Sequence, residues 1–155
     1  MKVLVIAIGQ KLPDWANTAC EDYLRRFPKD WNVEVKALKA EDRNTKTTEK
    51  IMQAEAERIR SAIPKNSVLV ILDERGVDLT SVKLASKLNS WNDQGRTVVF
   101  VIGGADGLDK HLKAEGELML RLSSLTLPHA MVRVLILEQI YRSWSLLHNH
   151  PYHRA

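Results

Sequence analysis

Short apolar runs alternate with stretches of helical periodicity along the whole chain. Runs rich in β-branched and aromatic residues, with no charge inside them, are typical of strands buried on both faces. Apolar residues that recur every three or four positions predict helices packed on a sheet. These patterns predict strands at 2–9, 31–38, 67–72 and 97–102, a short strand within 118–127, and helices at 13–27, 48–63, 82–92, 110–117 and 131–148.

The alternation of strands and helices predicts an α/β fold with a largely parallel sheet flanked by helices. The segment 31–38 alternates apolar and polar residues, which indicates a strand with one solvated face. Polar residues at 41–47 predict a loop, and the run DERGVD at 73–78 predicts a turn. A length of 155 residues without an internal linker is that of one ordinary domain, so we expect a single domain over residues 1–155.

Composition narrows the functional classes. Apolar residues make up 45% of the chain and charged residues 27%, which excludes a disordered chain. The longest apolar runs fall far short of the roughly 20 residues of a membrane helix, and the first run has no cleavage site for secretion. The single cysteine, Cys20, cannot form a disulfide within the chain and is expected as a small buried residue. We therefore expect a cytoplasmic protein that does not bind a membrane.

A net charge of +4 leaves the kind of partner open. Lysine and arginine gain free energy by displacing counterions from phosphates, so RNA is one interpretation, but basic proteins of this degree also occur without nucleic acid. The densest basic cluster is RRFPK, with Arg25, Arg26 and Lys29. Such a cluster is typical of a phosphate-binding patch or of an ordinary helix end.

A glycine-rich loop, FVIGGADGL, follows the predicted strand at 97–102. Gly103 and Gly104 remove two side chains at the carboxyl end of that strand, where open α/β sheets bind ligands, and Gly107 allows a positive φ. Asp109 can cap the helix that follows. Ile102 stands where a dinucleotide motif needs glycine, and the loop lacks the lysine and hydroxyl of a P-loop. Both a ligand-binding loop and a plain tight turn remain open.

Two further segments have the composition of a binding site. Leu72 ends a buried strand next to DERG and is expected at the same edge of the sheet as Gly103. The run LSSLTLPH surrounds hydroxyls with apolar side chains, which suits an adenine ring held by backbone hydrogen bonds but also suits a core segment. His129 and Arg133, one before and one inside the last long helix, are either site residues or have capping and surface roles.

The carboxyl-terminal run NHPYHRA is rich in aromatic and hydrogen-bonding groups. Tyr152 can stack on a base, and Arg154 can pair with a phosphate. A frayed, solvated end is the alternative. Pro151 interrupts any regular helical arrangement of the three histidines, and no neighbouring cysteine or carboxylate completes a ligand set, so we expect no metal.

Four ordered motifs together resemble the family of ribosomal RNA large subunit methyltransferase H, within the SPOUT superfamily. They are LRRFPKD, IGGADGL, LTLPH with VRVLILEQIYR, and NHPYHR. The resemblance runs from the first strand to the last residues, although at 41–57 only the character of the residues matches.

The resemblance implies an enzyme that uses S-adenosylmethionine to methylate N3 of a pseudouridine in large-subunit ribosomal RNA, on assembled ribosomes. It also implies a deep trefoil knot in the carboxyl-terminal part of the fold, which periodicity does not predict, since knots are nearly absent among protein folds. The cofactor contacts that it implies fall at Leu72, Gly103, Leu122, Ser123, Ser124, Leu125, Thr126 and Leu127.

Catalysis and RNA binding are expected from polar groups elsewhere in the chain. The candidates for the loss of the imide proton are His129, Tyr152, His153 and Arg154, and those for RNA binding are Arg25, Arg26, Lys29 and Arg133. The apolar excess of the helix at 131–148, together with the resemblance, predicts a homodimer that contacts the ribosome. Two other hypotheses remain: a non-catalytic RNA-binding module, and another α/β enzyme with a nucleotide cofactor.

Overall fold

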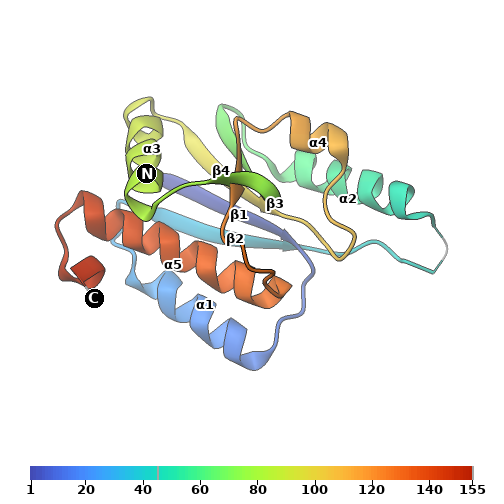
Figure 1. Cartoon of the computed structure of the whole chain (residues 1–155), viewed down its shortest axis with the longest axis horizontal. Helices are drawn as coiled ribbons and strands as arrows, with labels where there is room; N and C mark the ends of the chain where they lie inside the picture. Colours follow the sequence, from blue (N-terminus) through green and yellow to red (C-terminus); the bar gives the residue numbers. More distant parts are fainter. Residues whose placement is uncertain (45, 155) are drawn as a thin grey trace.

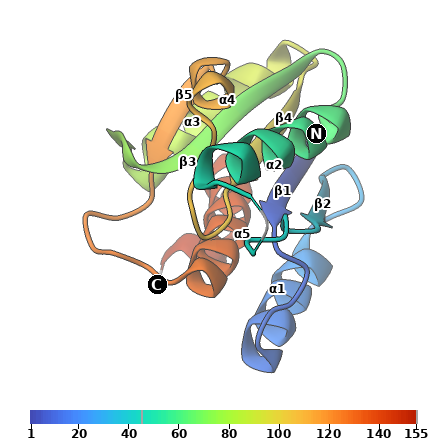
Figure 2. The same cartoon turned by 90° about the vertical axis from the view of Figure 1, so that its right-hand side faces the viewer.

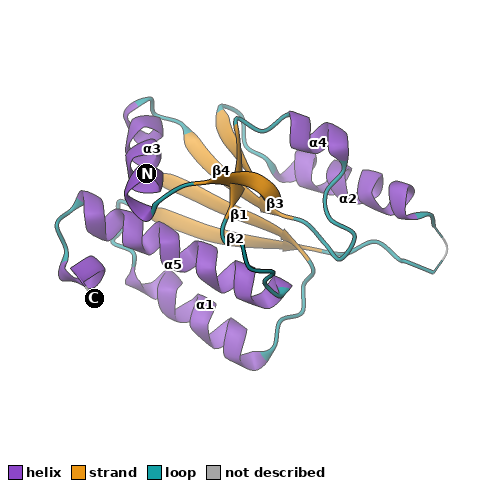
Figure 3. Cartoon of the chain, viewed as in Figure 1, coloured by secondary structure: helices purple, strands orange, loops and turns teal. Residues whose placement is uncertain are grey.

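Five parallel strands form one sheet, in the order β2-β1-β4-β3-β5, with helices on both of its faces (Figures 1 and 3). The computed structural model describes residues 1–44 and 46–154, so Thr45 of the predicted loop at 41–47 and Ala155 lie outside the described residues. The elements are β1 (Lys2–Ile8), α1 (Asp14–Arg26), β2 (Asn32–Leu38), α2 (Thr48–Ala62), β3 (Ser67–Asp78), α3 (Ser81–Asp93), β4 (Thr97–Ile102), α4 (Lys110–Ala114), β5 (Leu118–Arg121), α5 (His129–Leu147) and a 3-10 helix, η1 (Pro151–Arg154).

The sheet is buried on both faces, as the uninterrupted apolar runs predict. Along β1, Val3 and Val5 point into one core and Leu4 and Ile6 into the other. The first core is closed by α1, α3 and α5, and the second by α2 and α4. Figures 1 and 2 show α1 and α5 side by side on one side of the sheet. The predicted α/β class with a parallel sheet is therefore confirmed.

Local patterns also hold at the edge strand and in the first helix. In β2 the residues alternate between exposed and half-buried positions along the strand until Leu38, as expected for an edge strand with one solvated face. Cys20 is buried in α1 as a free thiol.

In the part of the chain that the structure describes, no helix combines the length and hydropathy needed to cross a membrane.

The prediction of a turn at 73–78 is wrong, because β3 continues to Asp78. Leu120 of β5 pairs with Leu72 and again with Val77, so the residues between them bulge out of the ladder. The bulge brings the backbone of Gly76 so close to β5 that a Cβ there would lie 2.6 Å from the carbonyl carbon of Leu120. The bent second half of β3 can pass over β5 only because position 76 lacks a side chain (Figure 1).

Two further boundaries differ from the sequence pattern. Helix α4 ends at Ala114 rather than near 117, because the chain turns at Gly116, whose missing Cβ would lie 2.8 Å from Ile71 Cγ1. Beyond α5, residues Pro151–Arg154 form η1 and pack against α5, so within the described residues the tail is ordered rather than frayed. The trefoil knot implied by the resemblance stays a prediction.

The close crossing of β3 and β5 makes Gly76 a sensitive position. We expect Gly76→Ala to lower the free energy of unfolding by about 1–3 kcal/mol, because the added methyl must push the two backbones apart. The matched control is Arg75→Ala, which changes an exposed side chain in the same bulge and should stay within about 0.5 kcal/mol of the parent. Urea denaturation measures both, and a Gly76→Ala protein as stable as the parent would contradict the crossing.

Candidate functional site

A cavity of about 650 Å³ opens at the carboxyl ends of β3, β4 and β5. Its lining includes Leu72, Ile102 and Leu120 from the strand ends, the loop at 103–108, the loop at 121–127 except Ser124, and the first turn of α5. The structure thus brings together every residue that the resemblance assigned to the cofactor apart from Ser124, namely Leu72, Gly103, Leu122, Ser123, Leu125, Thr126 and Leu127.

The glycine loop folds on itself at one wall of the cavity. The N–H of Gly107 donates to the carbonyl of Gly104 at 3.0 Å, and Gly107 has the predicted positive φ of 84°. A Cβ at Gly103 would meet Leu108 Cγ at 2.8 Å and the carbonyl carbon of Gly107 at 3.0 Å. The glycine is therefore needed for the packing of the loop itself, and Gly103 also lines the cavity.

The opposite wall is the loop between β5 and α5, which extends outward from the sheet in Figure 2. The hydroxyl of Ser123 accepts a hydrogen bond from the N–H of Leu125 at 2.9 Å and so shapes this loop. The side chain of Leu125 is 77% exposed, which is unusual for a leucine that belongs to a cavity wall. An apolar side chain held open at the mouth of a cavity can cover an apolar ligand.

Charged residues at the cavity mouth were missed by the sequence analysis. Asp73 and Lys113 form an ion pair at 2.9 Å, and Asp106 pairs with Arg43 at 2.9 Å. Although burial pushes the pKa of Asp73 upward, the bonds from Lys113 and from the N–H of Arg75 outweigh it and hold this pKa below its usual range. The signal that could have found Asp73 is its position directly after a buried strand.

The half-buried His129 lines the same cavity and contacts the buried Arg133. Arg133 is only 3% exposed, and its Nη2 donates to the carbonyl of Gly9 at 2.8 Å and contacts Nε2 of His129 at 3.1 Å. Arg133 Nε has no partner among the described residues. The expectation that Arg133 contacts RNA is therefore corrected: its guanidinium lies inside the protein and ties α5 to the end of β1.

The environment of His129 argues against a role as proton acceptor. Burial, and then the positive charge of Arg133, lower the pKa of His129, while a backbone hydrogen bond with Gly103 opposes them. A guanidinium can only donate, so Nε2 of His129 uses its lone pair to accept from Arg133. His129 lines the cavity as a neutral imidazole whose acceptor nitrogen is already engaged.

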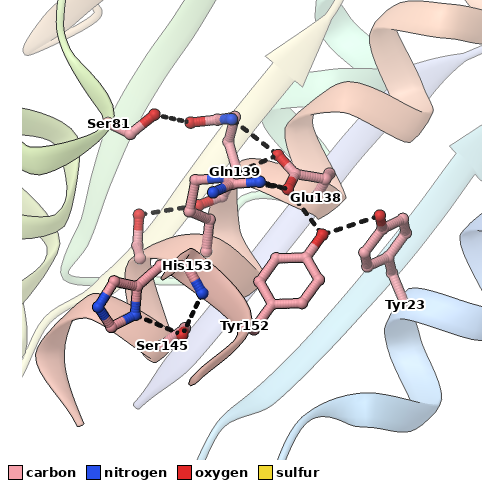
Figure 4. Close-up of polar contacts among 9 residues, drawn as sticks. Tyr23, Ser81, Glu138, Gln139, Ser145, Tyr152 and His153 are labelled. Carbon is pink, nitrogen blue, oxygen red and sulfur yellow. Dashed lines mark hydrogen bonds and ion pairs between the residues drawn. The ribbon is translucent and has the colours of Figure 1, made fainter. Parts of the chain in front are cut away.

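At the other end of α5, Tyr152 fastens the tail to two helices (Figure 4). Its hydroxyl donates to Glu138 Oε2 at 2.7 Å, which leaves its oxygen to accept from the hydroxyl of Tyr23 at 3.0 Å. Burial, followed by the hydrogen bonds with Tyr23 and Glu138, raises the pKa of Tyr152 above its usual range. Tyr152 is thus a protonated anchor in this structure.

His153 is held by the buried side chain of Ser145. Ser145 Oγ lies 2.8 Å from Nδ1 of His153, accepts from the N–H of His153 at 3.2 Å, and donates to the carbonyl of His150 at 2.9 Å. Arg154 is exposed at the end of η1. The tail therefore presents His153 and Arg154 from a fixed backbone.

The predicted basic cluster lies beside the tail. Arg25 and Arg26 end α1 and both pair with Asp22, at 3.6 Å and 2.8 Å. The Arg26 guanidinium also lies 5.7 Å from the ring centre of Tyr152. Lys29 follows as an exposed residue. The structure thus brings three of the four predicted RNA-binding residues to the end of the molecule that carries the tail.

The cavity and the tail lie at opposite ends of α5. In Figure 1 this helix runs from its first turn near the loop at 121–128 (orange) to the tail (red). Its 19 residues span about 28 Å at 1.5 Å per residue. Of the four catalytic candidates, only His129 meets the cavity within one chain, and Tyr152, His153 and Arg154 do not.

The three histidines near the end of the chain have separate partners. The His148 ring stacks on Trp144, and His150 Nδ1 accepts from the N–H of Tyr152 at 3.1 Å. No group of three histidine, cysteine or carboxylate side chains that could hold a metal exists within residues 1–44 and 46–154. The expectation of a metal-free site stays a prediction.

Comparisons with known proteins agree with the geometry. A family model described as a predicted SPOUT methyltransferase matches residues 1–153. The chain is 52% identical over 156 residues to ribosomal RNA large subunit methyltransferase H of Burkholderia thailandensis, with all of both chains covered. It is 54% identical over 154 residues to the protein of that name from Paracidovorax citrulli, with 99% of both chains covered.

Among solved structures, the SpoU methyltransferase AviRb from Streptomyces viridochromogenes aligns over 91% of this chain and 59% of its own, at 14% identity and a TM-score of 0.47. That likeness is too weak to add to the assignment. The family model and the full-length relatives suffice: the chain belongs to the SPOUT methyltransferases, in the family of ribosomal RNA large subunit methyltransferase H.

Proposed function

We propose that this methyltransferase uses S-adenosylmethionine to methylate N3 of a pseudouridine in large-subunit ribosomal RNA, on assembled ribosomes in the cytoplasm. Family membership and the names of the full-length relatives support ribosomal RNA as the substrate. The observation that carries the proposal is the cavity at the carboxyl ends of β3, β4 and β5, which gathers nearly all of the residues expected to hold the cofactor.

The residues of the cavity fit S-adenosylmethionine. Leu72, Leu122 and Leu127 offer apolar walls for the adenine ring, and the backbone around Gly103 offers hydrogen-bonding groups at the strand ends. When bound, the cofactor supplies a methyl group that its sulfonium already activates. The protein therefore needs no metal for this chemistry, and we propose that none is used.

The work left to the protein is to hold the target base in place and to help N3 lose its proton. His129 and Tyr152 are poor acceptors, because Nε2 of His129 is engaged by Arg133 and the hydroxyl of Tyr152 is bound to Glu138. His153 and Arg154 remain: an imidazole can take the proton, and a guanidinium can stabilise the developing anion.

The site is proposed to be shared between two copies of the chain. Within one chain, the first turn of α5 lines the cavity while His153 is held at Ser145 near the other end of the helix, and no tail residue lines the cavity, so a second copy is proposed to bring its tail to the first. Met131, Leu135 and Leu146 on α5 are only half-buried, which supports a homodimer interface along this helix. Each copy is proposed to act as one domain over residues 1–155, with Arg25, Arg26 and Lys29 next to the tail as RNA contacts.

Leu125 gives a clean test of the cofactor site, because its side chain is exposed and supports little of the fold. We expect Leu125→Ala to weaken S-adenosylmethionine binding about 5- to 30-fold, which is about 1–2 kcal/mol of lost apolar contact, without changing the melting temperature of the free protein. Val82→Ala is the matched control, since Val82 is 65% exposed on α3. Titration calorimetry, with and without EDTA, measures the affinity of both variants for S-adenosylmethionine. Equal affinities of the two variants would refute the site at Leu125, and binding lost on chelation would refute the proposal that no metal is used.

Deleting residues 152–155 tests the role of the tail. The truncated protein should bind S-adenosylmethionine normally yet transfer little tritiated methyl to ribosomes that carry unmethylated pseudouridine. Arg154→Ala alone should lose about ten- to a hundredfold in rate, the value of one charge-assisted contact made in the transition state. If the truncated protein transfers methyl groups at the parental rate, the tail has only a structural role.

Mixing two inactive variants tests whether the site is shared. The truncated protein keeps its cavity, and a Leu125→Asp protein, with a charge at the apolar mouth of the cavity, keeps its tail. Subunit exchange should restore about a quarter of the parental activity, because half of the dimers are mixed and each has one complete site of two. A mixture that stays inactive although the variants exchange subunits would exclude a site shared in this way.

A further inference from the structure

The hydroxyl of Ser145 contacts several polar groups but has only one proton to donate, so it must act as acceptor for the others. This residue of α5 is fully buried, so water does not supplement its partners. Its Oγ donates to the carbonyl oxygen of His150 at 2.9 Å, because a carbonyl has no proton and can only accept. The contact of 2.8 Å between Ser145 Oγ and Nδ1 of His153 therefore requires the proton to be on Nδ1.

That arrangement fixes which nitrogen of His153 is free. In a neutral imidazole one ring nitrogen donates and the other accepts, so a proton on Nδ1 leaves the lone pair on Nε2. Nε2 of His153 has no hydrogen-bond partner within the described part of the chain, and the side chain is half-exposed (Figure 4). His129 is the opposite case, since its Nε2 already accepts from Arg133.

The backbone that carries His153 is also fixed. Tyr152, the residue before it, is bound to Glu138 and Tyr23, and Glu138 in turn accepts from Arg142 at 2.9 Å. The N–H of His153 donates to Ser145 Oγ at 3.2 Å. Two residues of α5 and one of α1 therefore hold the tail in the conformation in which Nδ1 of His153 is bound to Ser145 and Nε2 has no partner among the described residues.

We propose that Nε2 of His153 accepts the proton from N3 of the pseudouridine, and that Ser145 is the positioning residue that selects the required tautomer of His153. The N3–H bond breaks, its electron pair stays on N3 as the nucleophile, and the proton adds to Nε2 to give an imidazolium that later releases it to water. This inference rests on the proposed function, because it assumes that the tail serves methyl transfer to a pseudouridine. Ser145 touches neither substrate nor cofactor and acts only through His153.

The tautomer can be read without any activity assay. In the full-length protein labelled with ¹⁵N-histidine, long-range ¹H–¹⁵N correlation spectra distinguish Nδ1–H from Nε2–H, and a His153→Gln variant identifies the His153 signals. We expect Nδ1–H for His153 in the parent and a shift toward Nε2–H in Ser145→Ala. Ser143→Ala is the matched control: Ser143 is equally buried on α5, but its hydroxyl donates to the carbonyl of Gln139 and not to the tail.

Methyl transfer then tests the role of Nε2. The asparagine in His153→Asn places its amide near the position of Nδ1 and can still donate to Ser145, but it has nothing at the position of Nε2. We expect this variant to lose at least about a hundredfold in kcat, as for removal of a general base, with little change in KM for ribosomes. Ser145→Ala should lose less in kcat, and Ser143→Ala should keep the parental value.

The outcomes separate this inference from the proposed function. A parent protein with Nε2–H at His153, or a His153→Asn protein with parental kcat, would overturn the role of His153. An unchanged tautomer in Ser145→Ala would overturn the role of Ser145. If deletion of residues 152–155 leaves methyl transfer intact, the proposed role of the tail fails and the role of His153 as proton acceptor fails with it, whereas the tautomer of His153 is read from the spectra whatever that result is.

Discussion

The length and rigidity of α5 govern where chemistry can take place in this protein. The helix is fixed to the sheet by Ile136, Leu137 and Ile140, which are fully buried, and to the end of β1 by the bond from Arg133 to the carbonyl of Gly9. A helix held along its whole length does not bring its two ends together. Because the first turn lines the cavity and the last turn carries the tail, a site that needs both must draw on two copies of the chain.

The cavity and the tail are held by different kinds of interaction. At the cavity, apolar side chains and tight backbone turns leave space for a ligand, and the charged groups form ion pairs at the mouth. At the tail, hydrogen bonds run from Ser81 to Gln139, on to Glu138, and from there to Tyr152 and Tyr23 (Figure 4). This chain of bonds links α3, α5, η1 and α1, so the tail is positioned by side chains from the whole helical layer.

The sequence predicted the features that depend on local pattern. Apolar runs, and apolar–polar alternation in the case of β2, predicted the five strands that the structure describes, and Asp109 caps α4 by accepting from the N–H groups of His111 and Leu112. The extension of β3 could not be predicted, because residues 73–78 look like a turn and are held extended by pairing with β5, more than forty residues later. The order of the tail was equally hidden, since it depends on Tyr23 and Tyr152, which are 129 positions apart.

For the candidate site, too, the sequence predicted what depends on local motifs but not what depends on long-range contacts. The resemblance identified the residues of the cavity wall, but the roles of His129 and Arg133 depend on contacts that no spacing reveals. An arginine in an apolar helix is expected on the surface, yet Arg133 is buried because it donates to the Gly9 carbonyl and to the ring of His129. The exposed Leu125 could be recognised as unusual only once its neighbours were known.

Crosslinking tests the central claim, a site made from the cavity of one copy and the tail of another, most directly. With cysteines introduced as Leu125→Cys and Arg154→Cys, a short bismaleimide cannot join the two positions within one chain, because α5 separates them, and the native Cys20 is buried. We predict a covalent dimer on a denaturing gel, absent from either single-cysteine variant. A protein that stays monomeric on the gel, while both introduced thiols react fully with a monofunctional maleimide, would contradict the account.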